Sequence, residues 1–93
     1  MKKSILISML FLSVIGAFAQ GNNEEKSWIE KAKTLNEAEN YRGSLNAYLK
    51  AYKLNPKNAE TVYQIAWTYN DLDVYDTAII YANKGILLDA KDL

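Results

Sequence analysis

Apolar residues recur at spacings of three and four residues along four separate stretches of the chain. This spacing places them on one side of a helix, whereas a half-buried strand needs an apolar residue at every second position. The pattern predicts helices over about 24–38, 41–54, 59–72 and 75–88. No stretch shows sustained alternation with a period of two, so the predicted fold class is all-α.

The inward faces of these helices are expected to hold large and small apolar side chains together. The predicted inward residues are Trp28, Ala32, Leu35, Tyr41, Leu45, Tyr48, Ala51, Tyr52, Leu54, Val62, Ile65, Ala66, Tyr69, Ala78, Ile79, Ala82, Ile86 and Leu88. Small residues such as Ala32, Ser44 and Gly85 let helix axes approach closely, while the bulky residues fill the space beside them. We also expect the Ser44 hydroxyl to donate to a carbonyl one turn earlier in its own helix.

Polar residues between the apolar stretches predict where helices begin and end. For the first helix the sequence leaves two N-caps open, either Ser27 with a glutamate three residues later or Asn23 followed by two glutamates. Asn40 and Asn58 are expected to cap the second and third helices. Pro56 ends the second helix because proline has no amide donor. Connections this short force consecutive helices to lie antiparallel.

Similar residues return after 34 positions, as at Tyr41 and Tyr75. A fixed period of this size indicates supersecondary units that stack side by side and do not close into a single globule. The spacing is the same between Ala32 and Ala66. The chain is therefore expected to contain two copies of one helical hairpin.

This pattern resembles the tetratricopeptide repeat, a helix–turn–helix unit of 34 residues. Aligned on the terminal proline of that family, the two units are 25–58 and 59–92. The matching positions are Trp28, Ala32, Leu35, Ser44, Tyr48, Ala51 and Pro56 in the first unit and Val62, Ala66, Tyr69, Ala78 and Gly85 in the second. Glu39 and Asp73 stand at the usual turn glycine, and Ala82 stands where the family has an aromatic ring. The resemblance implies an α-α superhelix of four helices that binds proteins and has no catalytic activity.

The N-terminal residues have a different pattern. Two lysines precede an apolar run over 5–15, and a small-residue motif ending in Ala19 follows. This order is typical of a secretory signal peptide, and the run is too short to span a bilayer comfortably. We expect 1–19 to be a signal peptide, with only transient membrane contact, and 20–24 to be a linker. The product is then periplasmic or secreted. The alternative is an uncleaved membrane anchor.

Composition removes several classes of function. The chain has no histidine and no cysteine, and so lacks the usual bases, soft metal ligands and disulfides. Its eleven basic and eleven acidic residues form no basic stripe, so a nucleic-acid surface is not expected. Asp71, Asp73 and Asp76 lack the glycine and distal glutamate of a calcium loop and are interpreted as solvated helix-end acids. We expect neither an enzyme nor a cofactor nor a metal site.

Two candidate surfaces remain for a protein or peptide partner. The resemblance implies a groove along the first helix of each unit, at Ile29, Lys33, Asn36, Tyr63, Gln64, Trp67 and Asn70. The aromatic pair Tyr63 and Trp67, flanked by amides, suits an extended peptide. In the alternative interpretation, Trp67 packs against a neighbouring helix and the asparagines only face water.

The second candidate surface is an end face on the last helix. Ile80 and Leu87 occupy positions that the family usually fills with charge, and an exposed apolar face commonly marks an interface. We expect this face to dock onto a protein partner or onto a second copy of the chain. Three roles stay open: an interaction scaffold, a self-associating component of an envelope assembly, or the N-terminal part of a longer repeat protein, such as a sensor or an enzyme accessory region.

Overall fold

The computed structural model describes residues 23–91, and every regular element in that part of the chain is an α-helix. The helices are 23–37, α2 (Tyr41–Leu54), α3 (Ala59–Asp71) and α4 (Tyr75–Lys91). The all-α prediction is therefore confirmed. The predicted signal peptide, its cleavage after Ala19 and most of the linker over 20–24 lie outside the described residues.

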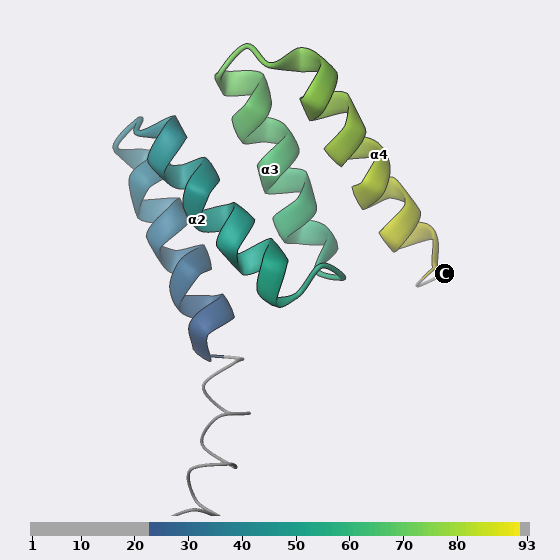
Figure 1. The fold of residues 1–93 in the computed structure, drawn as a ribbon, viewed down its shortest axis with the longest axis horizontal. Helices are drawn as coiled ribbons and strands as arrows, with labels where there is room; N and C mark the ends of the chain where they lie inside the picture. The colour runs from purple at the N-terminus through teal and green to yellow at the C-terminus, as the bar shows by residue number, and fades with distance from the viewer. Residues whose placement is uncertain (1–22, 92–93) are drawn as a thin grey trace, which may run out of the picture.

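The four helices form two hairpins that stand side by side (Figure 1). Connections of three, four and three residues join them, which leaves no room for a crossover. α3 packs against α2 on one side and α4 on the other. Within residues 23–91, no helix combines the length and apolarity that a membrane crossing requires.

The two helix–helix turns have the same backbone geometry. Glu39 and Asp73, 34 residues apart, have φ angles of 61° and 62°, in the left-handed region that favours glycine. At both turns the amide of the next residue donates to the carbonyl five residues earlier, at 2.8 and 2.9 Å. These bonds satisfy carbonyls at the end of a helix and hold two non-glycine residues in a conformation that costs about 1–2 kcal/mol each.

The asparagine caps are confirmed. The Asn40 side chain accepts a hydrogen bond from the Gly43 amide at 3.0 Å, and the Asn58 side chain accepts one from the Thr61 amide at 3.4 Å. Each bond satisfies an amide that has no partner within the first helical turn.

The two N-caps predicted for the first helix are wrong. Residues 23–37 are all helical, so both Asn23 and Ser27 already lie within helical turns. An N-cap needs a non-helical backbone, which neither residue has.

The predicted local bond of Ser44 is also wrong. Its buried hydroxyl donates to the Ala32 carbonyl on the neighbouring helix, at 2.9 Å. Both side chains are fully buried and small, so the two helices lie close enough for a side chain of one to reach the backbone of the other. Ser44 thereby joins the two helices of the first repeat.

The core centres on Ala32, Ala47, Tyr48 and Ile65, with half-buried aromatic and aliphatic side chains packed around them. Ile65 comes from α3 and is 0% exposed, so the second repeat inserts this side chain into the first. Within residues 23–91 the buried apolar residues are Ala32, Ala47, Tyr48, Ala51, Val62, Ile65, Ala66 and Ala78. Ala47 was not among the predicted inward residues.

Leu54, Ile79 and Ile86 were predicted to face inward, and all three are exposed. Leu54 is the last residue of α2, where the core has ended. The counterparts of Ile79 and Ile86 one repeat earlier, Leu45 and Tyr52, are half-buried because the second repeat packs on them. Within residues 23–91 no further helix packs on α4 in the same way.

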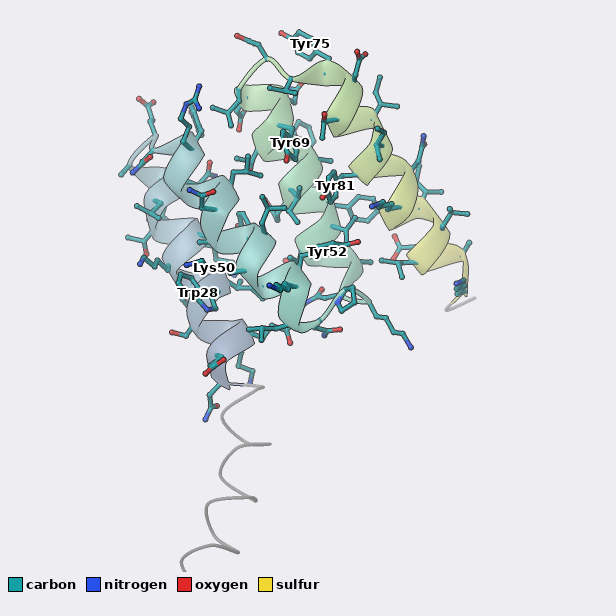
Figure 2. The ribbon with its side chains drawn as sticks, viewed as in Figure 1. Trp28, Lys50, Tyr52, Tyr69, Tyr75 and Tyr81 are labelled. Atoms are coloured by element: carbon teal, nitrogen blue, oxygen red, sulfur yellow. The ribbon has the colours of Figure 1, made fainter. Side chains whose placement is uncertain are left out.

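Three tyrosines join the two repeats on the side where α2, α3 and α4 meet (Figure 2). The Tyr81 ring lies 5.8 Å from that of Tyr52, edge to face, and 5.6 Å from that of Tyr69, nearly stacked. Lys84 places its ammonium 4.8 Å from the Tyr81 centroid. Such pairs stabilise contacts beyond the apolar area that they bury.

Candidate functional site

An open apolar cleft of about 430 Å³ lies between α3 and α4. Its lining residues are Tyr63, Ala66, Trp67, Asn70, Tyr75, Ala78, Ile79 and Ala82. Its size and its mostly apolar lining with a few polar groups are typical of binding sites. Its volume exceeds those of three other hollows on residues 23–91, which measure about 60, 350 and 180 Å³.

The structure divides the predicted groove into two parts. Tyr63, Trp67 and Asn70 line the cleft. Ile29, Lys33 and Gln64 instead line a cavity of about 60 Å³ between the first helix and α3. Asn36 is half-buried, and its Oδ1 atom is enclosed without a hydrogen-bond partner. The predicted groove residues thus line two separate hollows, and Asn36 lines neither of them.

Trp67 stands at the rim of the cleft with 65% of its surface exposed. The alternative interpretation, in which this ring packs against a neighbouring helix, is wrong. Tyr75 lines the same cleft from the start of α4 and is also exposed (Figure 2). Two large aromatic side chains thus border an apolar hollow in direct contact with water, an arrangement that usually marks an interaction site.

Gly85 and Asp89 hold Tyr63 in place. A Cβ atom at Gly85 would lie 2.5 Å from Cε1 of the Tyr63 ring, so only glycine lets this ring lie so close to the α4 backbone. The Tyr63 hydroxyl donates to Oδ2 of Asp89 at 2.6 Å. This hydrogen bond raises the pKa of Tyr63 above its ordinary value, with burial and the Asp89 charge acting in the same direction. The hydroxyl therefore remains a proton donor throughout the neutral range.

The floor of the cleft is deepened because the aromatic residue of the second repeat is displaced by one position. In the first repeat the Tyr48 ring fills the equivalent space and is 2% exposed. In the second repeat Ala82 stands there, while the neighbouring Tyr81 turns toward Tyr52 and Tyr69. A methyl group thus replaces a phenol ring at the floor of the cleft.

Four residues of α4 complete the site but were not among the predicted groove residues: Tyr75, Ala78, Ile79 and Ala82. The sequence did carry one signal for them, the missing aromatic at Ala82. Its consequence depends on where the neighbouring Tyr81 ring lies, which the one-dimensional pattern does not specify.

The predicted end face is separate from the cleft. Ile80 and Leu87 are exposed, and neither lines the cleft. Leu87 borders a shallower hollow of about 180 Å³, which Tyr52 and Lys84 also line. One repeat earlier, the same two positions hold the exposed polar residues Asn46 and Lys53. Docking on this face stays a prediction.

At the α3–α4 turn, Asp73 contributes both to the backbone turn and to a side-chain hydrogen bond. Asp73 adopts the left-handed backbone of the turn, and its Oδ1 accepts a hydrogen bond from the Tyr75 hydroxyl at 2.8 Å. Within residues 23–91, no three carboxylates are grouped so that they could share a metal ion.

A family model of the tetratricopeptide repeat matches residues 25–58 and 59–92, the same boundaries that the 34-residue period predicts. The two matches together span most of the chain and nearly all the residues that the structure describes. None of the curated proteins matches the sequence.

Proposed function

The chain belongs to the tetratricopeptide repeat family, whose repeats generally mediate binding between proteins, and we propose that it binds a partner protein through the cleft between α3 and α4. In this role the protein is a non-enzymatic scaffold. Its stacked hairpins hold the backbone of the lining residues in fixed positions, so that little backbone freedom is lost on binding.

The exposure of Trp67 beside the apolar cleft carries this proposal. Tryptophan and tyrosine dominate the energetics of protein interfaces because they bury a large area with few rotatable bonds. Asn70 and Tyr63, whose hydroxyl is held by Asp89, add the few polar groups that orient a ligand. The buried side chains of the core have no comparable surface to offer.

The site of action follows from the N-terminal pattern. We propose that residues 1–19 direct export and are removed, so that the scaffold acts in the periplasm or outside the cell. The intact mass of the protein recovered from the cells that produce it tests this. The expected mass is that of a chain beginning at Gln20, and retention of Met1 would contradict cleavage.

A photo-crosslinking amino acid in place of Trp67 should capture the partner in the cells that produce the chain. The same probe at Lys53, on the exposed side of α2, serves as the control and should capture little. With the partner identified, Trp67→Ala should weaken binding at least about tenfold without lowering the melting temperature, since this side chain packs little in the free protein.

The same experiment separates the alternatives. Capture only from a probe at Ile80 would move the binding surface to the end face, and Ile80→Lys with Leu87→Lys would then disrupt the complex. Crosslinks only between copies of this chain would favour a self-associating structural component. Equal capture at positions 67 and 53 would argue against a binding site in the cleft.

A further inference from the structure

The cleft has a counterpart one repeat earlier in which the covering element is visible. Moving each lining residue back by 34 positions gives Ile29, Ala32, Lys33, Asn36, Tyr41, Ser44, Leu45 and Tyr48. α3 covers this first surface: its Ile65 belongs to the same core cluster as Ala32 and Tyr48, with Leu45 packed against it. The second surface is built from the same positions of the same hairpin, and no element within residues 23–91 covers it.

The covering face of α3 is a helical stripe of Thr61, Gln64, Ile65 and Thr68, at spacings of three, four and seven residues from the first. Thr61, Ile65 and Thr68 are buried, and Gln64 lines the small cavity beside Ile29. The stripe has one aliphatic side chain at its centre and uncharged polar ones around it. Within residues 23–91, no helix presents such a stripe to the second repeat.

We infer that the cleft receives an amphipathic α-helix of a partner protein, which lies on the second repeat as α3 lies on the first. This inference rests on the proposed function and names the kind of partner. A helix fits better than an extended peptide because the surface is a copy of one that already binds a helix inside the same molecule.

The lining residues specify the chemistry of this helix. Because Ala82 replaces the Tyr48 ring, the space at the floor needs a side chain larger than isoleucine, such as Phe, Leu, Met or Trp, at the position of Ile65. Trp67 and Ile79 offer apolar surface on either side.

Charge adds a second requirement. Residues 59–91 carry five carboxylates, on Glu60, Asp71, Asp73, Asp76 and Asp89, against two lysines, a formal charge of −3. Lysine or arginine at the ends of the partner helix would complement this charge and speed association.

A second copy of the chain is a poorer occupant, although charge favours it. The first repeat, 25–58, has seven basic residues and four acidic ones, so it would be drawn toward the acidic second repeat. Suppose that the first helix of a second copy lay on the second repeat as α3 lies on the first. It would then place Lys31 at the position that Ile65 occupies in α3. Attraction between exposed charges is screened by salt, whereas a buried, unpaired ammonium is strongly unfavourable. The Lys31 ammonium now lies at the surface, 5.1 Å from the Trp28 ring.

Displayed peptide libraries test the inference on the full chain. The first library holds 18-residue helices in which four positions, spaced as in the α3 stripe, are varied. The second holds random peptides of the same length. Both are selected on the wild type and depleted on Ala82→Tyr, which restores the first-repeat residue and fills the floor of the cleft.

We expect the helix library to be enriched in Phe, Leu, Met or Trp at the Ile65 position and in basic residues at the ends. A synthetic peptide of the enriched sequence should bind Ala82→Tyr at least about tenfold more weakly than the wild type. Asn46→Tyr, which adds the same ring on the exposed side of α2, should bind it unchanged. Thermal unfolding checks that each variant is folded, and Ile79→Lys replaces Ala82→Tyr if that variant is not.

Several other results would contradict the inference, each in a different way. Enrichment only of random peptides without helical spacing would overturn the helix while leaving protein binding in place. So would a failure to enrich any sequence when a probe at position 67 still captures a partner. Helices that bind Ala82→Tyr and Ile79→Lys as well as the wild type would place the site elsewhere. A concentration-dependent dimer that Ala82→Tyr abolishes, seen by light scattering, would make a second copy the occupant. If neither library is enriched and the probe at position 67 captures no protein, this inference and the proposed function are both wrong.

Discussion

Replacing Ile65 with alanine should lower the free energy of unfolding by about 2–5 kcal/mol, the usual cost of removing a fully buried aliphatic side chain. Ile65 is 0% exposed and is the side chain that α3 inserts among Ala32, Ala47 and Tyr48. Two of these neighbours are alanines, which have no side-chain atoms that could move into the cavity. A protein this small has only about 3–5 kcal/mol to lose, so the variant should be largely unfolded at room temperature.

Urea unfolding followed by circular dichroism measures this effect, and Ile79→Ala is the matched control. Ile79 is the same residue type and also lies on a helix of the second repeat, but it is 59% exposed. Its replacement should change the free energy of unfolding by no more than about 0.5 kcal/mol. Equal losses in the two variants would contradict the assignment of the core to the junction between α3 and the first repeat.

Enlarging Ala32 to leucine should lower the free energy of unfolding by about 1–3 kcal/mol. Ala32 is fully buried, and its carbonyl accepts the Ser44 hydroxyl at 2.9 Å, so the facing helix leaves no space for three further carbon atoms. Leucine would push the two helices of the first repeat apart and break this bond, which adds to the loss.

The equivalent residue of the second repeat supplies the comparison. Ala66 lies 34 residues after Ala32, but it lines the open cleft between α3 and α4. A leucine at this position can extend into the cleft, so Ala66→Leu should cost less than Ala32→Leu in the same urea experiment. A larger loss for Ala66→Leu would mean that the cleft is closed in solution.

Both comparisons use the fact that the two repeats share a backbone but differ in what covers them. At the turns, the sequence was sufficient to locate equivalent positions, and the left-handed φ angles of Glu39 and Asp73 agree within one degree. At the surface of α4 the two repeats are no longer equivalent. The helix α3 covers α2, whereas no helix within residues 23–91 covers the corresponding face of α4. This difference exposes Ile79 and creates the cleft.

Several errors of the sequence-based predictions have the same origin. Ile79 and Ile86 have the spacing of inward residues, but burial needs a neighbour, and spacing along one helix carries no information about neighbours. Ser44 was expected to bond within its own helix, and its true acceptor lies on the facing helix at Ala32. The caps predicted at Asn23 and Ser27 failed because several polar residues near a helix start satisfy the same local rule.

The candidate site was predicted only in part, because the sequence carries no information about how side chains of different helices pack together. Tyr63, Trp67 and Asn70 were predicted from the resemblance to the tetratricopeptide repeat, which implies a groove along the first helix of each unit, and all three line the cleft. Ile29 and Lys33 belong to the same predicted groove but face a different, smaller cavity. The residues supplied by α4 required knowledge of how the Tyr81 ring turns.

By itself, the sequence determined the four helices, their turns and the 34-residue repeat, because these depend on interactions between residues close along the chain. Only the tertiary structure decided which apolar faces are covered, where the Ser44 hydroxyl finds its acceptor and where a cleft is left open. Those outcomes depend on side chains from different helices competing for the same space. The displacement of one aromatic ring, from the position of Ala82 to that of Tyr81, is visible in the sequence, but only the structure shows that it deepens the floor of an open cleft of about 430 Å³.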